Sequence, residues 1–430
     1  MSLPTYGEYK GSDIPWVGSV PTHWQVRPLL GVATERSEPN TGMRENNLLS
    51  LSYGRIVRKD IDANDGLLPE SFETYQIVQR GDIVLRLTDL QNDKRSLRSA
   101  QVLERGIITS AYLALAPTAA SSAFLAYLLR AYDLSKVFYS MGGGLRQSMK
   151  FDDLKRMPIA IPPEPEQTTI AAFLDRETAK IDALITEQEK LIALLAEKRQ
   201  ATISHAVTKG LNPKAAMKDS GVAWLGDVPA HWAVSALSYL ASIETGATPD
   251  RGEPNYWGGS IPWLKTGEVN WAPIREAEEF ITEAGIENSA AKVSKPGTLL
   301  MAMYGQGVTR GRVALLEIEA AYNQACAAIL FGSRVAPRFG RYFFMAAYDH
   351  VRDAGNETSQ MNLSAGLIAK IRLPVPPLHE QEAVVRFLDS ETEKLDLLEM
   401  DAERTIGLLK ERRSALIAAA VTGQIDVRNA

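Results

Sequence analysis

The sequence has very few of the residues from which disulfide bonds and metal sites are built. It contains a single cysteine, Cys326, so no disulfide can form within the chain and no zinc site can be built from several cysteines. Its five histidines are scattered, and no two of them form an H-x-x-x-H pair. We therefore expect a protein that holds no metal.

Long apolar runs are also missing. No stretch approaches the roughly 18 consecutive apolar residues that indicate a membrane-spanning helix. The first residues, MSLPTYGEYKGSD, lack the basic segment and the apolar stretch of a secretory signal. These absences predict a cytoplasmic protein without membrane association.

Several motifs of catalysis are missing as well. No Gly-Lys pair occurs, which excludes a phosphate-binding loop of the G-x-x-x-x-G-K-[ST] type. The chain has no N-P-P-[FY] or D-P-P-[FY] tetrapeptide of an amino-methyltransferase, and no E-x-K follows Pro249-Asp250 as in a common nuclease core. The glycine-rich residues 141–144 follow a predicted helix rather than a strand, which favours a flexible loop over a phosphate cradle. We therefore expect neither a catalytic residue nor a cofactor in this chain.

The charge of the chain is not typical of a nucleic-acid-binding protein, because its formal net charge is −5. Most of the acidic excess lies in two segments. Residues 164–210 carry 6 Lys and Arg against 8 Asp and Glu, and residues 378–430 carry 7 against 11. The rest of the chain is near neutral with local basic clusters, so its composition permits DNA contact without requiring it.

What the sequence does contain is a repeat. The phrase WVGSVPTHW at residues 16–24 returns as WLGDVPAHW at residues 224–232, with six of nine positions identical. A longer segment, residues 162–208, returns at residues 376–422 with 23 identities in 47 positions and no gap. The chain is therefore a tandem of two halves. In each half the repeated phrase and the repeated longer segment form a frame, and the insert between them differs. His23 and His231 have no carboxylate or nucleophile partner inside the phrase, so we expect each to pack with its tryptophan and cap a turn.

The longer repeat predicts two long helices. No proline or glycine interrupts residues 166–208, and apolar residues recur there at spacings of three and four. We expect this apolar seam at Ile170, Leu174, Ile181, Leu184, Leu191 and Leu195, and in the second copy at Leu388, Leu395, Leu398, Ala402, Leu409 and Leu416. Two such helices in one chain favour an antiparallel coiled coil, with the C-terminus near the N-terminus. The alternative is that each helix lies on a globular core.

The inserts, residues 25–161 and 233–375, read as α/β or α+β domains. In both, a strand, a polar loop, a second strand and a helix follow one another. The predicted segments are strands at 81–87, 107–117, 297–305 and 321–332, polar loops at 88–98 and within 306–318, and helices at 121–141 and 338–352. Domains with one fold and different loops are what two related readers of two targets would require.

Together these pieces resemble the specificity subunit of Type I restriction–modification enzymes over essentially the whole chain. The pieces are the doubled K-x-S-x-x-x-W-x-G-x-V-P-x-H-W opener from Lys10 and Lys218, the doubled P-P-x-x-E-Q…F-L-D-x-E-T-x-K-[IL]-D helix, the Ala-Val-Thr helix ends at 206–208 and 420–422, and PWLKTGEVN at 262–270.

The resemblance implies a division of the chain into five parts. These are target recognition domain 1 (1–160), a central helix (161–210), a linker (211–222), target recognition domain 2 (223–375) and a C-terminal helix (376–430). Each target recognition domain would read one half of a split, asymmetric double-stranded DNA target, and the paired helices would set the gap.

The resemblance also implies partners. Two modification subunits with S-adenosylmethionine would methylate adenine N6, and restriction subunits would add ATP- and Mg-dependent translocation and cleavage. This chain itself would not be an enzyme.

Arg, Lys, Gln and Asn are the side chains that read base edges and grip phosphates. In the first domain the candidates for DNA contact are Arg86, Gln91, Lys94, Arg95, Arg98, Arg146, Gln147 and Lys150. In the second domain they are Lys265, Thr266, Tyr304, Gln306, Thr309, Arg310, Arg312, Gln360 and Asn362. A different function remains open at this point: a scaffold in which two binding heads bridge proteins without DNA.

Overall fold

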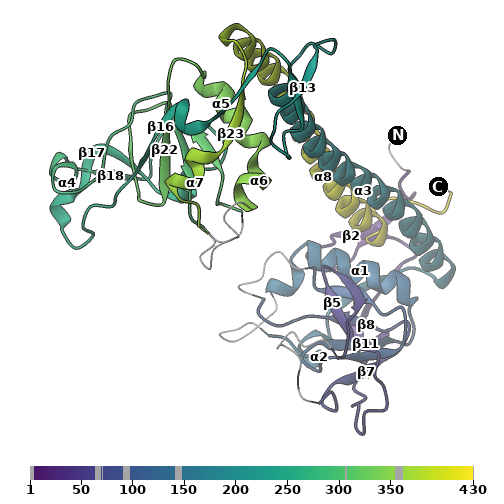
Figure 1. Ribbon diagram of the computed structural model, residues 1–430. Helices are drawn as coiled ribbons and strands as arrows, with labels where there is room; N and C mark the ends of the chain where they lie inside the picture. Colours follow the sequence, from purple (N-terminus) through teal and green to yellow (C-terminus); the bar gives the residue numbers. More distant parts are fainter. Residues whose placement is uncertain are drawn as a thin grey trace. The chain divides into compact units, whose positions relative to one another are not determined.

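A computed structural model describes residues 4–62, 69, 71–90, 97–140, 148–305, 308–353 and 362–429 (Figure 1). The chain divides into two compact units. The first unit comprises residues 1–189 and 404–430, and the second comprises residues 190–403. Each unit holds one α/β head and parts of both long helices.

The first head is built on an antiparallel sheet with the order β4-β11-β8-β9. These strands are Ala33–Arg36, Leu113–Pro117, Ile83–Leu85 and Ser99–Gln101. Because successive residues of a strand face opposite sides, Ile83 and Leu85 pack with helix α1 (Ser122–Leu134), whereas Val84 packs on the hairpin side of the sheet. The alternating apolar residues therefore build two cores, one on each face.

Short strand pairs surround this sheet. They are β1 (Tyr9–Gly11) with β2 (Ser19–Pro21), β3 (Gln25–Pro28) with β12 (Pro158–Ile161), β5 (Leu49–Ser52) with β6 (Arg55–Arg58), and β7 (Gln76–Val78) with β10 (Gly106–Ile108). The 3-10 turns η1 (Leu29–Gly31) and η2 (Val137–Ser140) and the short helix α2 (Phe151–Leu154) complete the unit.

The prediction of one continuous strand at 107–117 is wrong. The chain turns between its two parts, with the backbone N–H of Tyr112 donating to the carbonyl of Thr109 at 3.1 Å. The first part, β10, pairs with β7, and the second, β11, lies in the central sheet. The predicted helix at 121–141 is likewise shorter, because α1 ends at Leu134 and a 3-10 turn follows.

The second head repeats the central sheet, with the order β16-β22-β19-β20. These strands are Ala241–Thr245, Cys326–Phe331, Leu299–Ala302 and Val313–Leu315. Two strand pairs also have counterparts in the first head: β13 (Met217–Asp219) with β14 (Asp227–Pro229), and β15 (Ala233–Ala236) with β23 (Arg372–Val375). The strand order of the central sheet is therefore the same in both heads.

The second head adds a lobe of its own, β18-β17-β21, formed by Glu279–Ile281, Trp257–Leu264 and Ala321–Tyr322. Its helices are α4 (Glu283–Glu287), α5 (Pro337–Ala346), α6 (Tyr348–Asp353) and α7 (Ala365–Lys370), and its 3-10 turns are η3 (Leu237–Tyr239), η4 (Pro254–Tyr256) and η5 (Thr266–Glu268). The predicted helix at 338–352 thus consists of two short helices, α5 and α6.

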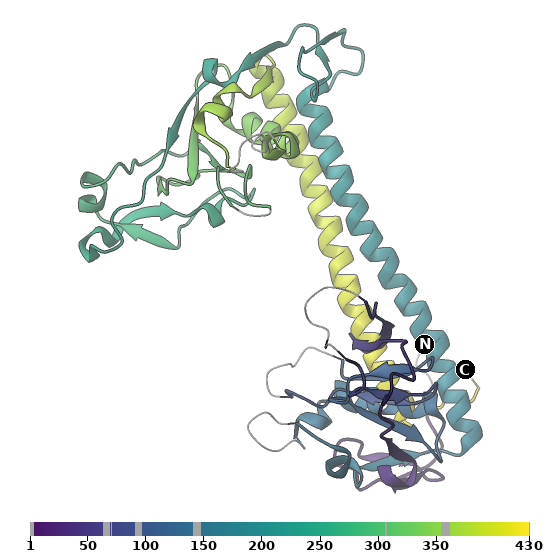
Figure 2. The ribbon, with the colours of Figure 1, turned by 60° about the horizontal axis from the view of Figure 1, so that its bottom comes forward.

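The two long helices are α3 (Glu164–Lys209) and α8 (Leu378–Val421). Within each unit, a segment of α3 lies beside a segment of α8, as Figures 1 and 2 show. In the first unit Arg413 Nε lies 3.1 Å from Asp182 Oδ1. In the second unit Arg199 contacts Asp396.

The predicted apolar seam needs two corrections in α3 and one in α8. Leu184, Leu191 and Leu398 are exposed, so they do not belong to the buried seam. In α3 the buried position next to Leu184 is Ile185, which lies four residues after buried Ile181. Ile181, Leu195, Leu395 and Ala402 are buried as the apolar spacing predicts.

The ends of the first unit lie together. The backbone N–H of Asp426 donates to the carbonyl of Pro4 at 2.7 Å, and the amide of Gln424 donates to the carbonyl of Ser19 at 3.1 Å. The predicted proximity of the two termini is confirmed. Across the described residues, no helix is apolar and long enough to cross a bilayer, and no cluster of His, Cys, Asp and Glu could ligate a metal.

Candidate DNA interface and the clamps that hold it

The repeated phrase of the first unit holds the start of α3. Glu166, in the first turn of that helix, accepts three side-chain hydrogen bonds. Its carboxylate oxygens lie 2.6 Å from the hydroxyl of Tyr6, 2.7 Å from Nε2 of His23 and 3.0 Å from Nε1 of Trp24. Glu166, Tyr6 and Trp24 are buried. We call this group of four residues the first clamp.

The second unit repeats the arrangement at the start of α8. Glu380 accepts hydrogen bonds from Nε1 of Trp232 at 2.9 Å and pairs with Nε2 of His231 at 2.8 Å. Burial acts to raise the pKa of Glu380, but the hydrogen bonds from Trp232 and His231 outweigh it and lower that pKa. We call these three residues the second clamp.

Each phrase also contacts the end of the other long helix. Gly423 follows α8 with φ +74°, and a Cβ there would lie 2.4 Å from Cδ of Pro21. Gly210 follows α3 with φ +73°, and a Cβ there would lie 3.0 Å from a ring carbon of Trp232. Glycine is favoured at both positions because a side chain would be strained at this positive φ; at Gly423 it would also collide with Pro21, and at Gly210 it would press on the ring of Trp232. The phrase occurs twice because each copy joins the start of one long helix to the end of the other.

The partner of each histidine was not found from the sequence. We expected no carboxylate partner within the phrase, and the partners indeed lie outside it, 143 and 149 residues further along the chain. A signal for them existed, because both glutamates occupy the same position of the repeated P-P-x-x-E-Q motif.

The rest of that motif attaches the heads. Gln167 accepts a hydrogen bond at 2.7 Å from the backbone N–H of Ser121, the residue before α1. Gln381 accepts one at 2.8 Å from Ala336, the residue before α5. The repeated F-L-D motif adds a second contact in each unit, in which the hydroxyls of Tyr127 and Tyr342 donate to Asp175 and Asp389 at 2.7 and 2.8 Å. Heads of different sequence are therefore fixed to the helices by the same contacts.

The structure brings together the two candidate segments of the first head. The β8–β9 connection runs from Arg86 to Arg98, and the second segment ends at Lys150. These segments meet where the backbone N–H of Met149 donates to the carbonyl of Leu87 at 2.9 Å. The candidates Gln91, Lys94, Arg95, Arg146 and Gln147 lie outside the described residues.

The second head repeats this meeting of segments. The β19–β20 connection contains Tyr304, Thr309 and Arg312, and the backbone N–H of Leu363 donates to the carbonyl of Met303 at 3.0 Å. Asn362 lies beside this bond and is exposed. The candidates Gln306 and Gln360 lie outside the described residues. In the first head, the β8–β9 connection therefore lies next to the residues that precede α2. In the second head, the β19–β20 connection lies next to the residues that precede α7.

Arg98 does not have the surface position that we expected. Its side chain is completely buried, and its guanidinium donates to the backbone carbonyls of Arg86, Thr88 and Asp89 at 2.8–3.2 Å and to the hydroxyl of Tyr139 at 3.0 Å. Such a side chain cannot reach DNA. Arg98 instead holds the start of the β8–β9 connection, and Arg86 and Lys150 are the described candidates that retain exposed surface.

The candidates of the second head differ in exposure. Arg310 is buried, with 8% of its surface exposed, whereas Thr309 and Arg312 are half-buried and Tyr304 is 40% exposed. Thr266 is half-buried and its hydroxyl lies 3.3 Å from Oδ1 of Asn323.

Lys265 is engaged by two glutamates. Its ammonium lies 2.7 Å from Glu279 and 3.3 Å from Glu278, and these hydrogen bonds raise its pKa. Lys265 is therefore charged, but its charge is balanced within the head.

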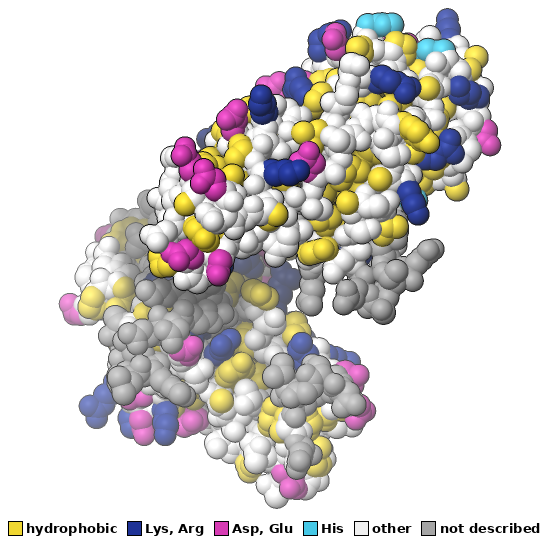
Figure 3. All heavy atoms as spheres, turned by 60° about the vertical axis from the view of Figure 1, so that its left-hand side comes forward, with side chains coloured by type: hydrophobic (Ala, Val, Ile, Leu, Met, Phe, Trp, Pro, Cys, Tyr) yellow, Lys and Arg dark blue, Asp and Glu magenta, His cyan; other side chains and the backbone are white. Residues whose placement is uncertain are grey.

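Arg251 is an exposed arginine that was not among the candidates, and it pairs with Glu279 at 2.6 Å. The guanidinium carbon of Arg251 lies 3.8 Å from the ring centre of Trp257 and 4.8 Å from that of Trp263, in the lobe of the second head. Among the described residues on the face shown in Figure 3, Lys and Arg side chains lie scattered among Asp and Glu.

Comparisons with known proteins agree with this architecture. The sequence pattern of the Type I restriction modification DNA specificity domain matches residues 111–193 and 229–404. The putative type I restriction enzyme MjaX specificity subunit of Methanocaldococcus jannaschii is 20% identical over 428 residues, which cover 96% of each chain. The MjaIX specificity subunit of the same organism is 22% identical over 169 residues, which span only 38% of each chain.

A solved structure has the same fold. It was described for the complex assembly and conformational transition of the type I R-M system. It superposes with a TM-score of 0.67 at 17% identity, covering 94% of this chain and 98% of its own. Since the family pattern covers more than half of the sequence, this chain belongs to the family of Type I restriction–modification specificity subunits.

Proposed function

We propose that this chain is the DNA-recognition subunit of a Type I restriction–modification complex, and that each head reads one half of a split, asymmetric target. One observation carries the proposal. The two heads share a strand order and bring a polar connection and a second segment together at the same place, through the Met149–Leu87 and Leu363–Met303 bonds. The residues at these places differ between the heads, which fits two different half-sites.

Within this proposal the candidate side chains have separate roles. Exposed Lys150 and half-buried Arg86 would contact phosphates or base edges in the first head. Tyr304, Thr309, Arg312 and Asn362 would do so in the second head. The candidates outside the described residues belong to the same two segments of each head and remain part of the proposal.

The two long helices would form an antiparallel coiled coil that relates the halves by a pseudo-two-fold axis. Two ion pairs support this, because Asp182–Arg413 and Asp396–Arg199 occupy the same positions of the repeat with the partners exchanged. The two clamps, which each hold the start of one helix and the end of the other, support it further. Such a pair of helices would fix the number of base pairs between the half-sites.

Catalysis would lie in the partners. The matching frames of the two halves offer two similar surfaces, which fits the docking of two modification subunits that carry S-adenosylmethionine. Restriction subunits with ATP and Mg would complete the complex. The chain itself would hold no cofactor, and it would recognise the DNA site without catalysing a reaction.

The experiment that tests this function is DNA binding by the chain assembled with its modification subunits. A reader that neutralises phosphates loses affinity steeply as salt rises. Methylation-sensitive sequencing of DNA modified by the complex should reveal one bipartite asymmetric sequence. A complex that assembles but binds DNA without salt dependence and methylates no defined sequence would favour the protein-bridging scaffold instead.

A further inference from the structure

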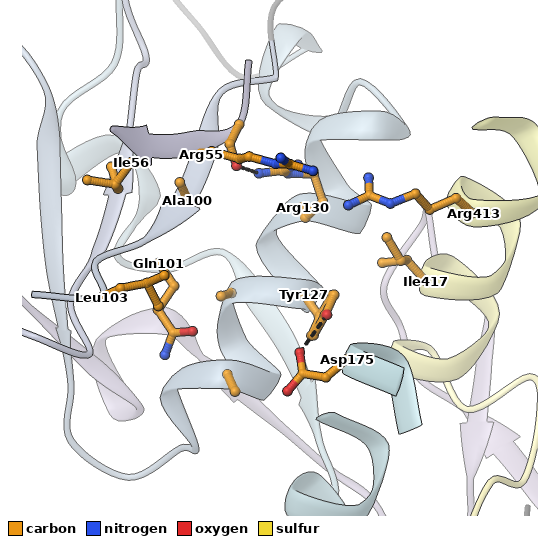
Figure 4. Close-up of a pocket in the computed structure, with 13 residues that line it drawn as sticks. Arg55, Ile56, Ala100, Gln101, Leu103, Tyr127, Arg130, Asp175, Arg413 and Ile417 are labelled. Atoms are coloured by element: carbon orange, nitrogen blue, oxygen red, sulfur yellow. Dashed lines mark hydrogen bonds between the residues drawn. The ribbon is translucent and has the colours of Figure 1, made fainter. Parts of the chain in front are cut away.

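The first unit contains a pocket of about 340 Å³ at the junction of its head with the long helices (Figure 4). Its walls come from the β5–β6 hairpin, β9, α1, α3 and α8. One part of the lining is apolar and includes Ile56, Ala126 and Ile417, and Leu103 at the pocket is 68% exposed. The pocket is therefore open to solvent and has an apolar wall.

The other part of the lining is cationic. Arg55, Arg130 and Arg413 all line the pocket, and Figure 4 shows Arg413 extending from α8 toward Arg130. Asp175 is the acidic residue of the lining, and its carboxylate already accepts a hydrogen bond from the hydroxyl of Tyr127.

Arg55 and Arg413 share one carboxylate, that of Asp182. Asp182 lies 3.2 Å from Arg55 and 3.1 Å from Arg413, so one negative charge faces two guanidinium groups. Arg130 donates to neutral groups, the carbonyl of Gly54 at 2.6 Å and the hydroxyl of Ser99 at 3.2 Å. The lining of the pocket therefore carries three guanidinium groups and the one carboxylate of Asp175, with the shared carboxylate of Asp182 beside it.

The second unit does not repeat this excess at the matching positions. Arg199 is the counterpart of Arg413, and it contacts both Asp396 and Glu399. Ile185 stands in the first copy where Glu399 stands in the second. The residue three positions after Tyr342 is Met345, whereas the residue three positions after Tyr127 is Arg130. The repeat thus supplies an additional carboxylate in one half and an additional guanidinium in the other.

We propose that this pocket binds one small organic anion, a phosphate ester or a carboxylate with an apolar body. Guanidinium groups hold phosphate and carboxylate oxygens through paired, charge-assisted hydrogen bonds. The wall that contains Ile56 and Ile417 takes the apolar body. This function is additional to DNA recognition and does not depend on it.

The electrostatics of Arg130 agree with an anionic ligand. Its pKa is lowered to about 10, chiefly by burial. Asp133 acts to raise this pKa, while the charges of Arg413 and Arg55 lower it further. An anion in the pocket would offset the mutual repulsion of the three groups.

The test is calorimetric titration of the full chain, without DNA, with phenyl phosphate, phenylacetate and inorganic phosphate. We expect one site per chain and tighter binding of a phenyl-bearing anion than of inorganic phosphate. Arg55→Gln and Arg413→Gln should each weaken binding roughly tenfold or more, because each removes charge-assisted hydrogen bonds. Arg386→Gln, an exposed change on α8 in the second unit, should leave binding unchanged.

Two outcomes would overturn the proposal. One is the absence of saturable binding of all three probes at millimolar concentration by chain whose circular dichroism is native. The other is binding that persists in both Arg55→Gln and Arg413→Gln. DNA affinity of the same variants is measured separately. If it falls while no anion binds, the arginines belong to a DNA interface and the pocket proposal is wrong, although the proposed DNA-recognition function would stand.

Discussion

Removing the carboxylate of the first clamp should destabilise the first unit strongly. In Glu166→Ala, the indole N–H of Trp24 and the hydroxyl of Tyr6 lose their acceptor, and both side chains are buried. A buried donor without a partner costs about 1–3 kcal/mol, so the two together predict a loss of about 2–6 kcal/mol in the free energy of unfolding. His23 adds little because its side chain is 41% exposed and can bond to water.

The second clamp gives an internal comparison. In Glu380→Ala, Trp232 is the buried donor that loses its acceptor, and His231 is exposed. The predicted loss is therefore smaller, about 1–3 kcal/mol. Glu164→Ala is the matched control, because this exposed residue lies in the same first turn of α3 and should change stability by only about 0.3–1 kcal/mol through the helix dipole.

The assay is urea unfolding of the full chain, followed by tryptophan fluorescence and by circular dichroism. Both probes are needed because the two units can unfold separately. The reasoning predicts the order Glu166→Ala, Glu380→Ala, Glu164→Ala from most to least destabilised. It would be refuted if Glu166→Ala unfolded at the same urea concentration as Glu164→Ala, or if the loss at Glu380 exceeded the loss at Glu166.

Three further predictions follow from the same contacts. The folded state lowers the pKa of Glu380, so the stability that Glu380 contributes should be fully present above its unfolded pKa near 4.5. This contribution should fade as the pH falls through the lower folded pKa. In urea titrations at several pH values, Glu380→Gln should abolish this part of the dependence of stability on pH. Gly423→Ala should lower the free energy of unfolding, because Gly423 has a positive φ and contacts Pro21. Gly407→Ala, in open space within α8, should raise the free energy of unfolding by roughly 0.5–1 kcal/mol; equal effects of the two changes on the urea midpoint would contradict the tight fit of the helix end. Residues 1–212 expressed alone should form an antiparallel homodimer. With modification subunits, this homodimer should direct methylation of an inverted repeat of the first half-site. The pairing would be excluded if light scattering showed a stable monomer at micromolar concentration and this monomer still directed methylation of the asymmetric site.

The frame of this protein was predictable because its sequence occurs twice in the chain. The repeat at 162–208 and 376–422 gave the positions of α3 and α8, since uninterrupted apolar spacing of three and four is a strong helix signal. The same repeat could not choose between Leu184 and Ile185 for the buried seam. Adjacent apolar residues both fit the spacing, and the face that is buried depends on the partner helix.

The contacts that cross the fold were harder to predict. Glu166 and Trp24 are 142 residues apart, and no local pattern joins them. Arg98 ends a densely polar stretch that reads as a solvated loop, yet its guanidinium is buried because its several donors satisfy backbone carbonyls of the same connection. The break of the predicted strand at 107–117 depends on a turn at Thr109, where two halves join different sheets.

The proposed division of catalysis between chains gives a direct expectation for the purified protein. The chain alone should show no methyltransferase, ATPase or nuclease activity. Methylation that depends on S-adenosylmethionine and needs no partner subunit would contradict the assignment of the chain as a subunit that only recognises DNA.

The measurement that tests the central claim most directly is an exchange of one head. Residues 233–375 are replaced with the corresponding insert of a relative, which keeps both clamps and both long helices. The complex with modification subunits is then used to modify DNA, and the methylated sites are sequenced. Independent heads on a common frame predict that one half of the recognised sequence changes while the other half and the gap persist. If both halves changed together, or if neither changed, the account of one half-site per head would be wrong.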